Sequence, residues 1–158
     1  MRFDAAMDRD GNRQVIPAPL PFHSTKTMTF AGGTTNDPGD FDGTGNPATL
    51  FTVTGDVMVF IMGVCKTTLV GAATLEVGVT GATSSLLAQI ADATTLAVNE
   101  GYVDATPTLG EAFTPQFHLI GGGLDIIQTI GSANITAGKI DYHCFWRPLS
   151  SDGNIVSA

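Results

Sequence analysis

Two cysteines and three histidines are the side chains best suited to chemistry in this 158-residue chain. A cysteine thiolate activated by a neighbouring histidine can act as a nucleophile. The possible pairs in this chain are Cys65 or Cys144 with His118 or His143. Both cysteines stand in apolar, strand-like segments, and apolar surroundings suppress thiolate formation. His143 and Cys144 are adjacent, so on a regular strand they point to opposite faces. The pattern predicts buried free thiols and a protein that is not an enzyme.

The spacing of the histidines does not indicate a metal site. A zinc site is typically announced by CxxC or HxxxH spacing, which the chain lacks. A cupin-type enzyme needs several histidines and a carboxylate converging on one metal, and His23, His118 and His143 do not cluster in the sequence. We therefore expect no metal and no other cofactor.

One acidic loop has a partial cation motif. Asp40, Asp42, Thr44 and Gly45 match the opening of a calcium-binding loop, in which oxygens at alternate positions surround the ion. The closing glutamate of that motif is replaced by Phe51, and no helical pattern flanks the loop. We expect a loop stabilised by its own turns, with cation binding by Asp40 and Asp42 left open.

The elements that position these residues are strands. The run Thr49–Cys65, TLFTVTGDVMVFIMGVC, is nearly all apolar or threonine and carries one charge, Asp56. It predicts a buried strand, and the block Val57–Met62 leaves no face for water, which indicates cover on both sides. Gly55 and Gly63 are expected to mark bends or bulges beside this block. A membrane helix needs about 20 apolar residues, more than the run provides.

The last long segment, 134–147, shows the clearest alternation. One face is predicted to carry Ile140, Tyr142, Cys144 and Trp146, and the other Asp141, His143, Phe145 and Arg147. Further strands are predicted at 23–30, 67–80, 94–103, 111–120 and 124–130, and 84–91 is predicted as a strand or a single turn of helix.

About eight strands with Gly-rich turns predict an all-β fold, a jelly-roll-like β-sandwich. We expect the body to span residues 23–148. An extended N-terminal arm over residues 1–22 precedes it, and a short C-terminal tail over residues 149–158 follows it.

Charge is sparse in the body and the total is acidic. The net charge is −8, which argues against a nucleic-acid partner because phosphate binding needs clustered Lys and Arg. Only twelve charged side chains lie in the 111 residues from Ala48 onward. A surface of this kind is typical of a protein that packs against other protein. The alternative is a Thr-rich β-protein with an ordinary exterior.

The first residues read differently from the body. MRFDAAMDRDGN has no apolar segment of the kind found in signal peptides, so we expect synthesis and retention in the cytoplasm. Prolines at 17, 19 and 21 favour extended polyproline geometry. We interpret the segment as an arm that contacts a neighbour, although a disordered tail is the alternative for an isolated monomer. Its apolar anchors are predicted to be Phe3, Val15, Ile16, Leu20 and Phe22.

Several phrases in the chain resemble small virion proteins of tailed bacteriophages. They are TLFTVTGDVMVFIMGVC, TLEVGVTGATSSLLAQIADATTL and the ending KIDYHCFWRPLSSDGNIVSA, so the resemblance covers about residues 48–158 and leaves out the arm. It implies a structural protein of the head-decoration, or cement, type. Such a protein sits on the capsid exterior as a homo-oligomer, with a trimer favoured and the major capsid protein as partner.

Two other functions stay open at this stage. A neck, tail-tube or fibre-base protein of the virion would share the same composition. A carbohydrate-binding β-sandwich is the alternative from another class, with Trp146 or Tyr102 as exposed platforms; both aromatics also suit a core or an interface.

Overall fold

The computed structural model describes residues 6–7, 13–14, 22–32, 36–110, 112 and 114–158. Within them every regular element is a strand except the 3₁₀ turn η1 (Ala93–Thr95). The strands are β1 (Ala6–Met7), β2 (Arg13–Gln14), β3 (Phe22–Phe30), β4 (Ala48–Thr54), β5 (Val57–Val70), β6 (Thr74–Val79), β7 (Ala82–Ile90), β8 (Gly101–Tyr102), β9 (His118–Ile120), β10 (Ile126–Gly131), β11 (Ala137–Pro148) and β12 (Asn154–Ser157).

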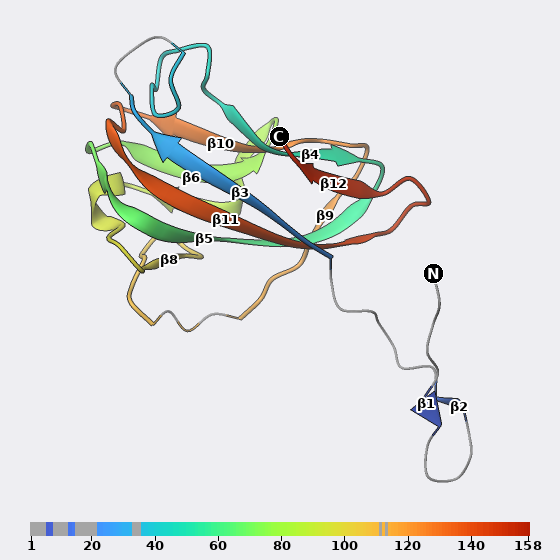
Figure 1. Ribbon diagram of the computed structural model, residues 1–158. Coiled ribbons are helices and arrows are strands. Elements are labelled where there is room, and N and C mark those ends of the chain that lie inside the picture. Colours follow the sequence, from blue (N-terminus) through green and yellow to red (C-terminus); the bar gives the residue numbers. More distant parts are fainter. Residues whose placement is uncertain (1–5, 8–12, 15–21, 33–35, 111, 113) are drawn as a thin grey trace.

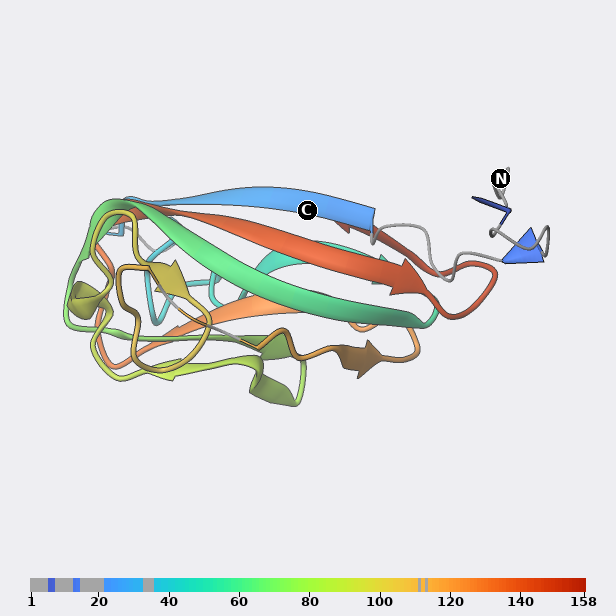
Figure 2. The same ribbon diagram turned by 90° about the horizontal axis from the view of Figure 1, so that it is seen from below.

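Two antiparallel sheets form the layers of a sandwich (Figure 1 and Figure 2). The first, which we call the β11 sheet, has the order β3-β11-β5-β8, and β9 also pairs with β5. The second, the β10 sheet, has the order β12-β4-β10-β6-β7. Among the described strands, β1 and β2 pair with each other in a separate ladder. The predicted all-β sandwich is confirmed.

Gly55 and Asp56 form a corner between β4 and β5, which lie in opposite sheets. The prediction of one strand over Thr49–Cys65 is therefore wrong. Gly55 has a φ of 63°. The Asp56 N–H donates to Ser150 Oγ at 2.8 Å, and Asp56 Oδ1 accepts from the Gly122 N–H at 2.9 Å. A glycine allows either a bulge or a corner, so the sequence alone did not separate the two.

The block Val57–Met62 alternates between the core and the outside. Its odd-numbered side chains are at most 2% exposed, while Met58, Phe60 and Met62 are half-buried on the outer face of the β11 sheet. The predicted cover on both sides is therefore wrong, because only one side of the block faces the core. The β-branched residues occupy that inner side, where their shape packs well on the pleated surface.

The face assignment on β11 is confirmed. Ile140, Tyr142, Cys144 and Trp146 are buried, and the residues between them are half-buried on the outer face. Cys144 and His143 therefore lie on opposite sides of the sheet. This strand pairs with β5 on one side and with β3 on the other, so it runs through the middle of its sheet.

A buried polar contact joins the two sheets. Tyr142 Oη donates to Gln128 Oε1 at 2.7 Å, and both side chains are at most 1% exposed. Burial raises the pKa of the Tyr142 phenol, which keeps the hydroxyl protonated as a donor. The contact fixes β11 against β10 at one position in the core.

Tyr142→Phe is expected to lower the free energy of unfolding by about 1–3 kcal/mol, because it leaves the buried Gln128 oxygen without its donor. Chemical denaturation with linear extrapolation measures the loss. The matched double variant Tyr142→Phe/Gln128→Met removes both partners and should recover part of it. A single variant as stable as the native chain would show that the contact contributes nothing.

Two predicted strands are mostly loop. In the range 94–103 only Gly101–Tyr102 is a strand, and in 111–120 only His118–Ile120 is one among the described residues. At the start of the first of these segments a 3₁₀ turn replaces the predicted strand. Its N-cap is Asp92, whose carboxylate accepts a hydrogen bond from the Thr94 N–H at 2.9 Å. The segment 84–91, predicted as a strand or a helical turn, belongs to β7 except for its last residue, Ala91.

The end of the chain belongs to the body. Residues 149–158 were predicted as a tail, whereas β12 pairs with β4 along its whole length and Ile155 is 3% exposed. Ser24 Oγ donates to the Ile155 carbonyl at 3.3 Å, and Lys26 Nζ donates to the Ala158 carbonyl. These contacts connect the β3 edge of one sheet to the β12 edge of the other and close that side of the sandwich.

The predicted loop over residues 31–47 contains no strand in its described part. Its backbone is nonetheless anchored on the segment before β11. The Gly32 N–H donates to the Ile135 carbonyl at 3.1 Å, and the Ile135 N–H donates to the Gly39 carbonyl at 2.8 Å. Asn46 bonds both backbone groups of Ile130, through Nδ2 at 2.7 Å and Oδ1 at 2.9 Å. The loop is thus fixed to β10 and to the start of β11.

Candidate functional site

The outer face of the β11 sheet carries an unusual concentration of rings and methionines. No described element covers it, and Figure 2 shows β3, β11 and β5 side by side as one layer of the sandwich. We call this surface the aromatic face and define it by residues on four segments: His23 on β3, Met58, Phe60 and Met62 on β5, His143 and Phe145 on β11, and Phe117 with Leu119 at β9.

Strand register brings these side chains together. In the ladder of β11, Phe145 is opposite His23 on one side and Phe60 on the other. His143 is opposite Met62, and Leu119 is opposite Met58. Residues directly opposite in antiparallel strands point to the same face, so the surface is continuous across β3, β11, β5 and β9.

The rings form a connected series centred on Phe145. The centroids of His23 and Phe145 are 4.5 Å apart with planes at 9°, and those of Phe60 and Phe145 are 6.0 Å apart at 21°. Phe117 extends the series, with its centroid 6.1 Å from that of Phe60. These distances lie in the range of favourable aromatic pairs. The series presents flat, partly exposed apolar area.

The most exposed members lie along β9 and just before it. Phe117 is 51% exposed and Leu119 is 71% exposed. Large apolar side chains gathered in one place at such exposure are characteristic of an interaction surface, whereas single ones are ordinary. Methionines beside them add flexible apolar contact that adapts to a partner's shape.

Two histidines place a polar contact inside this face. His23 Nε2 and His143 Nδ1 are 3.1 Å apart, a hydrogen bond in which one ring donates and the other accepts. Burial, and then the proximity of His23 and Lys66, lowers the pKa of His143, while Asp141 acts in the opposite direction. Protonation of both rings would remove the acceptor, so the contact requires at least one neutral histidine.

Stability is expected to fall as the pH falls below about 6.5, the ordinary histidine value. The folded chain holds the pKa of His143 below that value, so in this window the unfolded chain binds more protons and acid favours unfolding. Thermal unfolding between about pH 7.5 and pH 5.5 measures the decline. His143→Gln should flatten it relative to the native chain, and an unchanged slope in that variant would contradict the assignment.

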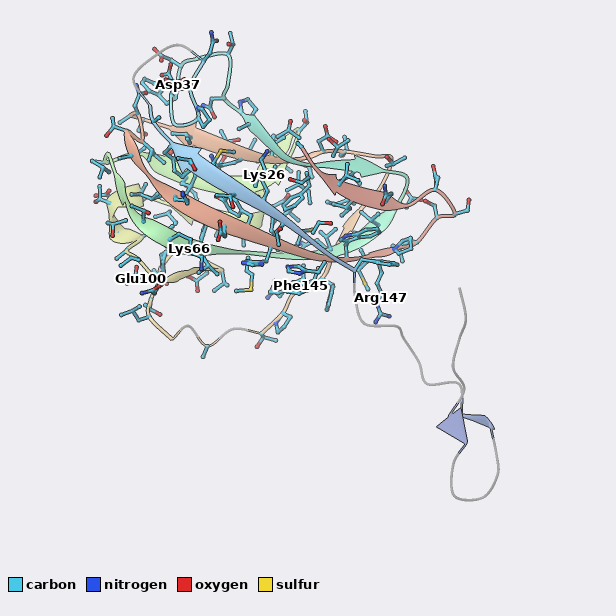
Figure 3. All side chains as sticks on the ribbon, viewed as in Figure 1. Lys26, Asp37, Lys66, Glu100, Phe145 and Arg147 are labelled. Carbon is cyan, nitrogen blue, oxygen red and sulfur yellow. The ribbon has the colours of Figure 1, made fainter. Side chains whose placement is uncertain are left out.

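Charged groups stand at the margins of the aromatic face. Arg147 is opposite Met58 at one end, near the start of β3, and Asp141 lies toward the other end of β11. Figure 3 shows Phe145 and Arg147 close to the point where the chain enters β3. Thr27 Oγ1 donates to Asp141 Oδ1 at 2.6 Å. Between these margins the surface is neutral apart from the histidines.

A cavity of about 420 Å³ opens beside this face, between β5, β7 and the segment leading to β9. Phe60 and His118 contribute to its wall from the side of the β11 sheet. Its polar lining comes from Ser84, Ser85, Asp104, Thr114 and Gln116. The volume and the mixed lining suit a small neutral polar molecule.

The predicted anchors of the arm fall mainly outside the described residues. Phe3, Val15, Ile16 and Leu20 are in that group. Phe22 is described: it is 43% exposed, and its ring stacks on Trp146 with centroids 4.7 Å apart. Trp146 Nε1 donates to Ser24 Oγ at 3.1 Å. The base of the predicted arm is therefore fixed to the body beside the aromatic face.

The thiols are buried and free, as predicted. Cys65 and Cys144 form no disulfide, and both are 0% exposed. Burial raises the pKa of both thiols, and that of Cys144 rises to about 12. A thiolate is disfavoured at both positions.

The acidic loop holds a carboxyl pair. Asp40 is buried, and burial together with a hydrogen bond that the protonated Asp40 donates to Asp42 raises the pKa of Asp40. Among the residues that the structure describes, no three His, Cys, Asp or Glu side chains come together as ligands of one metal ion. Cation binding by Asp40 and Asp42 gains no support from this geometry.

The two aromatic platforms suggested for sugar binding are wrong. Trp146 is 7% exposed and Tyr102 is 0% exposed, so neither offers a face to a ligand. Tyr102 Oη lies 2.8 Å from the Ala88 carbonyl and 3.0 Å from that of Leu75, where it bonds to the opposite sheet. Both rings belong to the core.

Sequence reasoning missed the aromatic face, although a signal was present. In VMVFIM the odd-numbered positions are all β-branched, and the even-numbered ones are Met, Phe and Met. This alternation distinguishes two faces within a run that is apolar throughout.

Comparison with protein-family models, with curated proteins and with solved structures found no match. In the part of the chain that the structure describes, no helix has the length and apolar character required to cross a membrane.

Proposed function

We propose that this chain is a structural virion protein that decorates the exterior of a bacteriophage capsid as a symmetric oligomer, with a trimer favoured. The observation that carries the proposal is the aromatic face: a neutral, partly exposed surface of rings and methionines on a body with few charges. Such surfaces are covered in the working state of a protein, and closed symmetry repeats each contact around an axis.

The strand order supports a jelly roll as the finer description of the body. Four strands of one sheet follow the order β3-β11-β5-β8, and four of the other follow β4-β10-β6-β7. Apart from the β6–β7 hairpin, the chain passes to the other sheet at nearly every connection, as in two interlocked Greek keys. The fold hosts capsid proteins, lectins and enzymes alike, so the function is inferred from the surface.

The arm adds contact area to such an oligomer. Segment 1–21 is rich in proline and in charge, and its linkage to the body raises its effective concentration at a neighbouring surface. We propose that it binds a neighbouring decoration subunit or the major capsid protein, with Phe3, Val15, Ile16, Leu20 and Phe22 as anchors.

A pelleting assay with capsid heads assembled without the protein tests this function. The full chain should sediment with the heads at a fixed ratio, and deletion of residues 1–21 should lower that ratio or reduce the oligomer. Unchanged occupancy together with unchanged oligomer size would exclude a role for the arm. A full chain that stays in the supernatant would exclude decoration, and a neck, tail-tube or fibre-base location would then be preferred.

A carbohydrate-binding function is favoured by one observation, the cavity beside Phe60. Hydroxyl, amide and carboxylate groups on its wall are the partners that sugars use, and a nearby ring offers a stacking surface. Titration calorimetry with a panel of neutral monosaccharides and disaccharides tests this alternative. Gln116→Ala should abolish any heat observed, and the absence of heat with every sugar would exclude the carbohydrate-binding alternative.

A further inference from the structure

We infer that the aromatic face receives the proline-rich segment Val15–Pro21 of a second copy of this chain. The inference rests on the proposed oligomer and specifies its contact. The proposed function leaves open which surface the arm binds. The position at which the segment joins the body, its composition and the chemistry of the face all bear on that question.

The segment joins the body at the edge of the face. Pro21 is followed directly by Phe22, the first residue of β3. In the β3–β11 ladder Phe22 is opposite Trp146, and His23 is opposite Phe145 at the centre of the face. In a symmetric ring each neighbour carries the same segment at the same edge of its own face.

Proline spacing disfavours a reversal of the segment onto its own body. To lie on the face of its own chain it would have to reverse direction immediately before β3. Ala18 and Leu20 each precede a proline, which disfavours the helical backbone conformation that a tight reversal uses. Neither is a glycine or asparagine, the residues that type II turns prefer. The segment is predicted to continue outward, so a second copy is the occupant that the chain itself supplies.

The chemistry of the two surfaces matches. The stretch from Gln14 to Phe22 carries no charge, and the centre of the aromatic face is neutral apart from its histidine pair. Proline-rich segments pack on exposed rings, and because their extended geometry is preformed they lose little entropy on binding. Met58 and Met62 border the rings and adapt to the side chains between the prolines.

The arrangement also sets the symmetry of the contact. Segment and face are different surfaces of one chain, so each copy gives its segment to one neighbour and receives another's. Contacts of this head-to-tail kind close into a ring when the rotation permits, which agrees with the proposed trimer.

Site-specific cross-linking in the full chain tests the inference. Ala18→Cys places a thiol in the segment, and Thr25→Cys places one on the face, opposite His143 in the β3–β11 ladder. The native thiols of Cys65 and Cys144 are buried, so they should not react with the cross-linker. The two variants are prepared separately, one carrying a mass tag, then mixed and treated with a short bismaleimide. A tagged heterodimer should form in high yield.

The matched control replaces Thr25→Cys with Thr52→Cys. Thr52 is also an exposed strand threonine, but it lies on the β10 sheet. The yield should be several-fold lower with this control, and lower again when Phe145→Lys is added to the Thr25→Cys chain. Equal yields for the two positions would overturn the inference.

Two further outcomes are informative. If the chain carrying both Ala18→Cys and Thr25→Cys cross-links only within itself, the segment binds its own body and the inference is wrong. If the heterodimer forms as expected and the protein still fails to bind capsid heads, the segment-to-face contact stands and the proposed function fails. The two conclusions can therefore be separated.

Discussion

Gly71→Ala is expected to lower the free energy of unfolding by at least about 3 kcal/mol, the largest loss we predict for a single methyl group. Gly71 has a φ of 120°, which side-chain-bearing residues rarely adopt, and an added Cβ would lie 2.1 Å from the Asn134 carbonyl oxygen. That oxygen belongs to the backbone just before β11, so it cannot rotate away. Thermal and chemical denaturation measure the loss.

Gly81→Ala is the matched control. Gly81 also has a positive φ, 86°, but nothing lies within 4 Å of its added Cβ. The control should therefore cost only the conformational term, about 1–2 kcal/mol. If Gly71→Ala and Gly81→Ala lower the free energy of unfolding equally, the clash with the Asn134 carbonyl is relieved at no cost, and this explanation of Gly71 is wrong.

Phe145→Lys is expected to convert the proposed oligomer to monomers. Phe145 lies between the rings of His23 and Phe60 at the centre of the aromatic face, where a charge would be buried without a partner on assembly. Residues at the centre of an interface commonly contribute about 2 kcal/mol or more, so association should weaken by at least about 30-fold. Sedimentation velocity over a dilution series measures the change.

Thr52→Lys supplies the control for added charge, because Thr52 is exposed on the opposite sheet. It should assemble as the native chain does. Phe117→Lys is a second test at a position that is 51% exposed and less able to disturb the fold. The aromatic face is not an interface if both lysine variants on it keep the native mass and the native melting temperature.

The sequence predicts side-chain faces well where one strand carries a strict alternation. On β11 the burial of Ile140, Tyr142, Cys144 and Trp146 agrees with prediction, because core and solvent faces differ sharply in residue type. In Thr49–Cys65 the single charge, Asp56, lies at the corner, but a polar residue beside Gly55 is equally compatible with a bulge inside one strand. The sequence also could not show that β4 and β5 lie in different sheets, since that depends on contacts with residues 66 and 94 positions away.

Short polar motifs caused the other differences. Asp92 caps a 3₁₀ turn inside a segment whose composition resembles a strand. At the end of the chain, residues 149–158 look like a polar tail. Ile155 nevertheless alternates with exposed neighbours on the edge strand β12, and its side chain packs into the core. Leu149, Ile155, Val156 and Ala158 are apolar, but only Ile155 is buried. The partner strand decides which of them is buried, and the sequence does not show that strand.

The aromatic face itself was within reach of the sequence. Alternation of β-branched residues with Met and Phe in β5 marks two faces, and Phe145 and His143 are on the predicted outer face of β11. What the sequence could not provide is the register that places Phe145 between His23 and Phe60. That register joins three separate segments into one surface.

Imaging of particles by electron cryomicroscopy tests the proposed decoration most directly. Heads mixed with the full chain are compared with heads alone. The account predicts added density on the capsid exterior at symmetry axes, three sandwiches to a site, with an aromatic face at each contact between neighbouring copies. Density at the neck or tail, or heads that remain bare, would contradict it.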